Sequence, residues 1–79
     1  MWPSKDPQKA LGAALHELRE ERRLAPQSVA DRAELSYDHY SAIEGGHRNP
    51  TWGTMRRIAK AFDVSVTELA KREEAQRAD

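Results

Sequence analysis

Apolar residues recur along most of the chain at spacings of three and four, and polar residues fill the positions between them. This spacing is typical of helices that bury one face, and no segment shows the strict alternation that is typical of a strand. The pattern predicts five helices, at about residues 7–23, 26–34, 37–44, 52–62 and 66–70. We therefore expect an all-α fold, a compact five-helix bundle.

The helix boundaries depend on residues that suit the free backbone groups at helix ends. Serine, threonine and aspartate side chains accept hydrogen bonds from first-turn N–H groups, and proline suits the first turn because it has no N–H. Such residues open every expected helix: Asp6 with Pro7, Pro26, Ser36, Thr51, and a capping box from Ser65 to Glu68. Gly45 and Gly46 end the third helix, because glycine adopts the left-handed conformation at little cost.

A chain of 79 residues has room for one domain with a modest core. We expect an N-terminal arm (residues 1–9), a helical domain (10–70) and a charged tail (71–79) that extends the last helix or frays. The core is expected to take the apolar residues at helical spacing: Leu11, Leu15, Leu18, Val29, Ala30, Ala33, Tyr40, Ile43, Met55, Ile58, Ala59, Phe62 and Leu69. Trp52 is assigned to the core as well, because it stands at helical spacing from Met55.

Composition excludes several classes of site. The chain has no cysteine, which excludes disulfides and thiolate metal sites and suits a reducing cytoplasm. No apolar run reaches membrane-spanning length and no signal peptide is recognisable, so we expect a cytoplasmic protein without membrane contact. His16, His39 and His47 fall on different elements without paired spacing, so no metal site is expected. No nucleophile with a base and no phosphate loop is present, and neither an enzyme nor a cofactor is expected.

Charge is balanced over the whole chain but unevenly distributed. The formal net charge is zero, from 13 basic and 13 acidic residues. Residues 45–62 hold no acid, and they carry His47 and four basic residues: Arg48, Arg56, Arg57 and Lys60. A locally positive stretch is typical of a nucleic-acid contact, but it is equally typical of a solvated helix face.

The segment from Pro26 to Glu44 consists of a helix, a short turn and a second helix. Residues within and around it form a recognisable pattern: Leu11-Gly12, Leu15, Leu18-Arg19, Leu24, Val29-Ala30, Leu35-Ser36, Tyr40, Ile43-Glu44, Gly46, Asn49-Pro50 and the run from Ile58 to Ser65. With this pattern, about residues 11–70 resemble the phage-repressor (Cro/cI-type) helix-turn-helix family. The resemblance implies a lambda-repressor-like DNA-binding domain whose second motif helix, about residues 36–44, enters the major groove of double-stranded DNA.

The resemblance also assigns roles to individual positions. Four positions match places where the family reads bases: Tyr37, Asp38, Ser41 and Ala42. Three match phosphate-contacting places, Gln27, Arg48 and Asn49, and Arg56 in the basic stretch is a further phosphate candidate. Arg19 and Glu44 match a partly buried ion pair that ties the first helix to the third.

Each base-reading role has a structural alternative. Tyr37 either stacks on a base or sugar or merely covers the helix end. Asp38 either accepts a hydrogen bond from cytosine N4 or only favours the helix N-terminus through the helix dipole. Ala42 either touches a thymine methyl group or serves as a helix former.

The chain departs from the family pattern in three places. Ala25 and Pro26 stand where the family has a small polar cap and a glutamine, which removes one cap and one phosphate contact. Glu34 stands where a turn glycine is usual, so we expect Glu34 to hold a left-handed backbone conformation. The recognition helix carries no arginine or lysine, so attraction to phosphates has to come from elsewhere.

Two classes of function follow from these features. The first is a sequence-specific transcriptional regulator of repressor or controller type, acting as a homodimer through the fifth helix by way of Val66 and Ala70. A stand-alone regulator, a restriction-modification controller and a DNA-binding antitoxin all remain open within this class. The second is a protein-interaction module or antitoxin component of the same fold with weak or no DNA binding, which the neutral charge favours.

Overall fold

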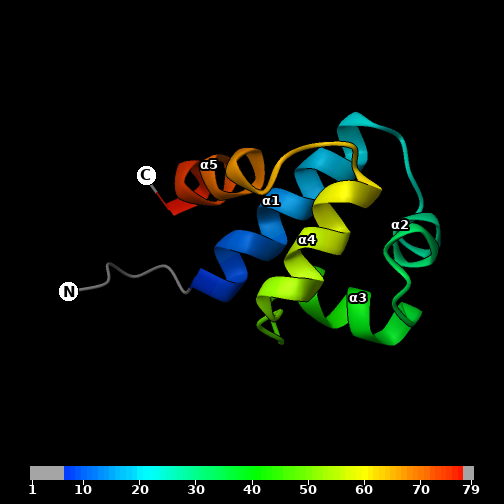
Figure 1. The fold of residues 1–79 in the computed structure, drawn as a ribbon. Coiled ribbons are helices and arrows are strands. Elements are labelled where there is room, and N and C mark those ends of the chain that lie inside the picture. Colours follow the sequence, from blue (N-terminus) through cyan, green and yellow to red (C-terminus); the bar gives the residue numbers. More distant parts are fainter. Residues whose placement is uncertain (1–6, 78–79) are drawn as a thin grey trace.

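The computed structural model describes residues 7–77 and confirms the all-α fold (Figure 1). Within this range the chain forms five helices and no strand: α1 (Pro7–Glu21), α2 (Pro26–Ala33), α3 (Tyr37–Glu44), α4 (Trp52–Ala61) and α5 (Val66–Arg77). The caps expected from the sequence hold the starts of three helices. The hydroxyl groups of Ser36, Thr51 and Ser65 each accept a hydrogen bond, at 3.0–3.1 Å, from the backbone N–H three residues later.

The first helix ends earlier than expected, whereas the last helix follows one of the two outcomes expected for the charged tail. α1 ends at Glu21, before the expected Arg23, because Arg23 has a left-handed φ of 54° that stops the helix. The charged tail extends α5 as far as Arg77. α1 begins at Pro7, where the first helix was expected to start, so the helix includes residues 7–9 of the expected arm. The expected cap at Asp6 lies outside the described residues.

The helices pack around one core. α1 lies against α5 and α3, and α2 lies against α4 and α3, so that α5 and α2 stand at opposite ends of the view in Figure 1. The largest fully buried side chains come from all five helices and the end of α4: Leu15, Leu18, Val29, Tyr40, Ile43, Ile58, Phe62 and Leu69. Every helix thus contributes to the same apolar interior.

The assignment of Trp52 to the core is wrong, since 64% of its surface is exposed. α4 buries Ile58 and Ala59, while Met55 is only half-buried at the core edge. Trp52 is the first residue of α4, and a step of six residues places it about 120° around the helix axis from Ile58. The core assignment of Trp52 rested on its spacing from Met55. Because Met55 is itself only half-buried, that spacing did not place Trp52 on the buried face of α4.

Two close contacts fix α1 within the bundle. At Gly12 the backbones of α1 and α3 approach so closely that a Cβ atom would lie 2.3 Å from the carbonyl oxygen of Glu44. At the other end of α1, Arg72 of α5 donates hydrogen bonds to both carboxylate oxygens of Glu21, at 2.9 and 3.0 Å, and to Glu17 at 3.3 Å. The charged tail is therefore part of the fold.

No helix in residues 7–77 has the length and apolar character needed to cross a membrane.

Candidate nucleic-acid interface

The turn between α2 and α3 is held by its backbone. Glu34 has φ 59° and ψ 42°, which confirms the left-handed conformation predicted from its place in the sequence. Its N–H donates to the carbonyl of Asp31 at 3.1 Å, and the N–H of Leu35 donates to Ala30 at 2.9 Å. The side chain of Leu35 is buried in the core. These contacts fix the angle at which α3 leaves α2.

The burial of α3 decides which of its side chains are available to a ligand. Tyr40 and Ile43 are fully buried, so the opposite side of the helix faces outward. That side carries all four residues that sequence analysis assigned to base reading, and they share one face because they fall at helical spacing: Tyr37, Asp38, Ser41 and Ala42. Tyr37 and Asp38 are exposed, whereas Ser41 and Ala42 are half-buried. We call these four residues the recognition face.

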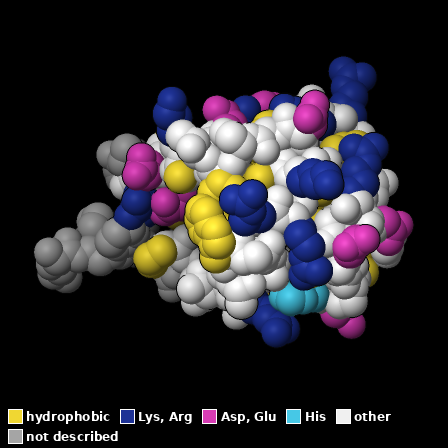
Figure 2. Space-filling model, viewed as in Figure 1, with side chains coloured by type: hydrophobic (Ala, Val, Ile, Leu, Met, Phe, Trp, Pro, Cys, Tyr) yellow, Lys and Arg dark blue, Asp and Glu magenta, His cyan; other side chains and the backbone are white. Residues whose placement is uncertain are grey.

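The four residues assigned to phosphate contacts are exposed but lie on three different elements. Gln27 lies in the first turn of α2, Arg48 and Asn49 in the loop after α3, and Arg56 on α4. The amide of Gln27 donates a hydrogen bond to the carboxylate of Asp31 at 2.8 Å on the exposed surface. Over the centre of the face viewed in Figure 2, lysine and arginine side chains lie beside an exposed hydrophobic patch.

The start of α2 shows the expected departure from the family. Ala25 precedes the helix in an extended conformation without a side-chain cap, and Pro26 occupies its first turn. Proline has no N–H, so this helix end offers one donor fewer to a bound anion.

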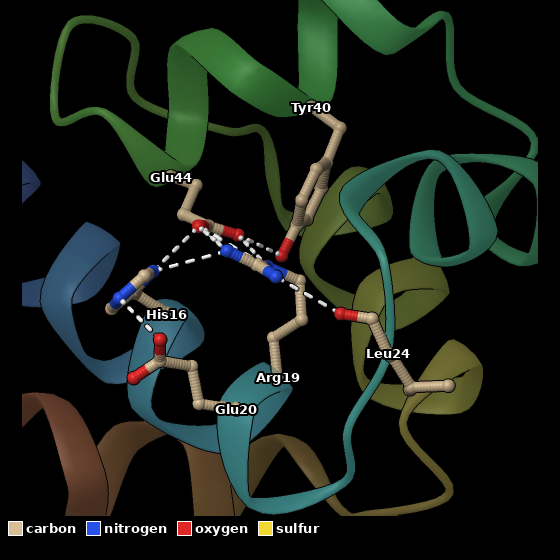
Figure 3. Close-up of polar contacts among 6 residues, drawn as sticks. All are labelled: His16, Arg19, Glu20, Leu24, Tyr40 and Glu44. Atoms are coloured by element: carbon tan, nitrogen blue, oxygen red, sulfur yellow. Dashed lines mark hydrogen bonds and ion pairs between the residues drawn. The ribbon is translucent and has the colours of Figure 1, made fainter.

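An ion pair joins α1 to the last turn of α3. The Arg19 guanidinium donates from Nε to Glu44 Oε1 at 2.9 Å and from Nη2 to Glu44 Oε2 at 2.8 Å (Figure 3). Only 14% of the Arg19 side chain and 13% of the Glu44 side chain are exposed. This is the pair that the sequence assigned to a structural role, and the structure gives it two-point geometry.

Three further groups complete this cluster, and sequence reasoning missed all of them. The Tyr40 hydroxyl donates to Glu44 Oε1 at 2.7 Å, and Arg19 Nη1 donates to the carbonyl of Leu24 at 2.9 Å. The His16 ring lies between two carboxylates, with Nδ1 3.0 Å from Glu44 and Nε2 3.3 Å from Glu20 (Figure 3). Spacings of three and four residues, from His16 to Arg19 and from Tyr40 to Glu44, were the available signal.

The cluster holds its charges in place. Burial raises the pKa of the Glu44 carboxyl, but the hydrogen bonds from Arg19, Tyr40 and His16 outweigh it and leave that pKa below its usual value. Burial, and then the hydrogen bond to Glu44, raises the pKa of the Tyr40 hydroxyl, which stays protonated and donates. Glu44 is thereby a fully used internal acceptor that orients α3.

No candidate metal centre accompanies this site. Across residues 7–77, no three histidine, cysteine, aspartate or glutamate side chains gather in a way that could hold a metal ion.

Comparison with known proteins identifies relatives of this arrangement. A family model described as a helix-turn-helix domain matches residues 10–71. An uncharacterized HTH-type transcriptional regulator, y4dJ of Sinorhizobium fredii, is 38% identical over 64 residues, which cover 81% of this chain and 83% of that protein.

Two solved structures share the fold. The clp gene regulator ClgR from Corynebacterium glutamicum has a TM-score of 0.90 at 22% identity, over 96% of this chain and 81% of that one. The restriction-modification controller protein C.Esp1396I, solved as a tetramer in complex with its natural 35 base-pair operator, has a TM-score of 0.86 at 18% identity. That match covers 96% of this chain and all of the controller chain.

Proposed function

The chain belongs to the Cro/cI-type helix-turn-helix family, and from this membership we propose that it binds double-stranded DNA sequence-specifically as a transcriptional regulator. The observation that carries the proposal is the recognition face of α3. Its four side chains face outward while Tyr40 and Ile43 lock the opposite side into the core. A helix held in this way can enter the major groove as one rigid body.

The recognition face supplies the contacts that specify sequence. Asp38, exposed in the first turn of α3, can accept a hydrogen bond from the N4 amino group of cytosine. Tyr37 presents a half-exposed ring to a base or sugar, and Ala42 a methyl group to thymine. Ser41 can donate to or accept from a base edge. The carboxylate of Asp38 gives the face a preference for cytosine-containing steps.

Phosphate contacts have to come from outside α3, because that helix contains no lysine or arginine. Arg48 and Asn49 follow α3 directly, Arg56 lies on α4, and Gln27 lies at the start of α2. Phosphate contacts fix register and orientation without reading sequence. We assign these four side chains to that role, with the exposed Gln27–Asp31 hydrogen bond exchanged for one to DNA.

A homodimer formed through α5 completes the proposal. Val66 and Ala70 lie on α5 away from the fully buried Leu69, where a second copy can meet them. A twofold dimer would present two α3 helices to half-sites about 34 Å apart, one turn of DNA. C.Esp1396I, which has the same fold, was solved as a tetramer on its operator, and this supports DNA binding by more than one copy of the chain. By analogy with this operator-bound controller protein, we assign the chain a repressor or controller role.

Selection from a randomised duplex library tests the function directly. The purified protein is expected to enrich one short, twofold-symmetric sequence and to bind it, in gel shifts at low and moderate salt, above unrelated duplexes. The symmetric site follows from the dimer and the enrichment from the recognition face.

The second candidate is a protein-interaction module or antitoxin component, and two features favour it: the net charge is zero and α3 carries no cation. Failure to enrich any sequence, together with no binding at low salt, where phosphate contacts are strongest, would favour this module over the regulator.

A further inference from the structure

A hollow of about 540 Å³ opens between α1, the start of α2 and the end of α3. Ser41 of the recognition face forms part of its lining, together with Lys9 of α1 and Pro26 of α2. A helix that enters the major groove has the two phosphate backbones along its sides. DNA held on the recognition face would therefore bring a backbone past this hollow.

The start of α2 offers few hydrogen-bond donors to a phosphate at this place. Pro26 has no N–H, and Ala25 before it makes no side-chain cap. The N–H of Ser28 already donates to the carbonyl of Ala25 at 3.0 Å. A helix N-terminus binds anions through its free N–H groups, and here one of those groups is missing and another is used. Attraction for a phosphate at the hollow has to come from another element.

Lys9 supplies an exposed cation at the rim of the hollow. It packs against the turn that ends α3, since a Cβ atom added at Gly46 would lie 3.0 Å from both Cα and Cγ of Lys9. Across residues 7–77 no carboxylate forms an ion pair with its ammonium group. Among the described residues that line the hollow, Glu44 is the one acid, and it is bonded within the cluster of Figure 3. The positive charge of Lys9 is thus available to a ligand.

The position of Lys9 does not serve the helices that it touches. Lys9 lies in the first turn of α1, where the positive end of the helix dipole disfavours a cation. At the end of α3, the carbonyls of Ser41, Ala42 and Ile43 already accept backbone N–H groups from the following turn, at 2.8–3.1 Å. These carbonyls need no lysine to cap them. A role in ligand binding explains the position better than a role in stability.

We propose that Lys9 binds a phosphate of the DNA backbone at this hollow, and so provides from α1 a positive charge that α3 and the start of α2 lack. The inference rests on the proposed DNA binding and adds a contact to the four phosphate contacts assigned above. Gly46, against which Lys9 packs, stands two residues before Arg48, so the two cations flank the same turn. Phosphate contacts on both sides of one turn fix the register of α3 in the groove.

Binding of the selected duplex at several salt concentrations tests the inference with matched variants. Lys9→Ala should reduce the slope of log affinity against log salt by about one, so that the ratio of parental to variant affinity falls about fourfold between about 50 and 200 mM salt. Lys71→Ala removes an exposed lysine from α5, which packs against α1 and α4, and should keep the parental slope. Lys9→Arg retains the charge and should keep that slope as well. In urea, Lys9→Ala should be as stable as the parent.

A second measurement locates the contact on the duplex. Methylphosphonate substitution removes the charge of one phosphate at a time, and each position of the duplex is tested with the parent and with Lys9→Ala. At one position in each half-site, the substitution should weaken the parent but cost Lys9→Ala no further affinity, because both changes remove the same contact. At the other positions the two losses should add.

Two outcomes would overturn the inference and leave the proposed function intact. These are a Lys9→Ala variant that keeps the parental slope, and losses of affinity that add at every phosphate position. A parent that binds no duplex even at low salt would overturn the proposed function and, with it, the Lys9 contact.

Discussion

Arg19 and Glu44 join α1 to the last turn of α3 through two hydrogen bonds, from Nε to Oε1 at 2.9 Å and from Nη2 to Oε2 at 2.8 Å. The same carboxylate accepts the Tyr40 hydroxyl, and the same guanidinium reaches the carbonyl of Leu24. One cluster thus links α1, the loop before α2, and the helix that carries the recognition face. The orientation of α3 therefore depends on residues outside the recognition face.

Glu44→Ala should lower the free energy of unfolding by about 2–4 kcal/mol, because it leaves the Arg19 charge partly buried without its partner. Glu20→Ala is the matched control: this carboxylate touches the same cluster through His16 but is exposed, and surface pairs contribute about 1 kcal/mol or less. Urea denaturation of both variants measures the difference. Equal midpoints for Glu44→Ala and the parent would show that the cluster does not hold the fold.

Stability should fall in acid partly through Glu44. Its folded-state pKa lies below the usual value of 4.5, so the folded protein binds its proton less readily than the unfolded chain does. The stabilisation is complete above the usual value and is lost as the pH falls through the lower, folded-state pKa. Glu44→Gln should flatten this part of the curve of unfolding free energy against pH. It should not abolish the slope, because Arg72 also lowers the pKa of Glu21. Parallel curves would contradict the assignment.

Glu34→Gly should stabilise the domain by about 1 kcal/mol. A side chain in the left-handed region costs about 1–2 kcal/mol, of which glycine recovers a part after its own loss of chain entropy. Glu34→Ala removes the same charge but keeps the Cβ atom, so it should bring no comparable gain. Thermal melts of both variants separate relief of backbone strain from removal of charge, and a gain shared equally by both would exclude strain relief.

Gly12→Ala and Gly53→Ala should have opposite effects, although both place alanine in a helix. A Cβ at Gly12 would lie 2.3 Å from the carbonyl oxygen of Glu44, and moving backbone apart costs about 1–3 kcal/mol. A Cβ at Gly53 would meet nothing closer than the Thr51 hydroxyl at 4.0 Å, so the better helix propensity of alanine should add about 0.5–1 kcal/mol. Calorimetric melting temperatures should fall for the first variant and rise for the second.

Arg48→Ala and Asp38→Ala should separate positioning from reading. Arg48→Ala should weaken binding to all duplexes alike and reduce the slope of log affinity against log salt by about one. Asp38→Ala should change the preference at one base pair by about 1–3 kcal/mol and leave that slope nearly unaltered. Binding isotherms at several salt concentrations, with operator and scrambled duplexes, measure both. An unchanged selected sequence for Asp38→Ala would remove Asp38 from base reading.

Much of this architecture could be predicted because its signals are local. Capping side chains, glycines and prolines bond or bend within a few residues of their own position, so Ser36, Thr51 and Ser65 marked the helix starts without any tertiary information. The left-handed turn at Glu34 and the Arg19–Glu44 pair came from a family pattern, which already contains tertiary information.

Contacts between distant residues were not accessible in the same way. Periodicity tells that a residue lies on some face of a helix, but not which face the neighbouring helices will cover. Trp52 was therefore assigned to the core and lies exposed, while the polar end of Tyr40 was overlooked because its ring is buried. The charged tail carried no sign that Arg72 would reach Glu17 and Glu21, more than fifty residues earlier.

The sequence by itself determined the five helices, their caps and the outward side of α3, because hydrophobic spacing and capping act within one or two helical turns. Only the tertiary structure decided that Glu44 meets Arg19, Tyr40 and His16 at once, and that Trp52 lines an open groove with Val66 and Ala70. Those relationships depend on how the helices cross. The crossing angles follow from the packing of all the side chains together, which no single segment encodes.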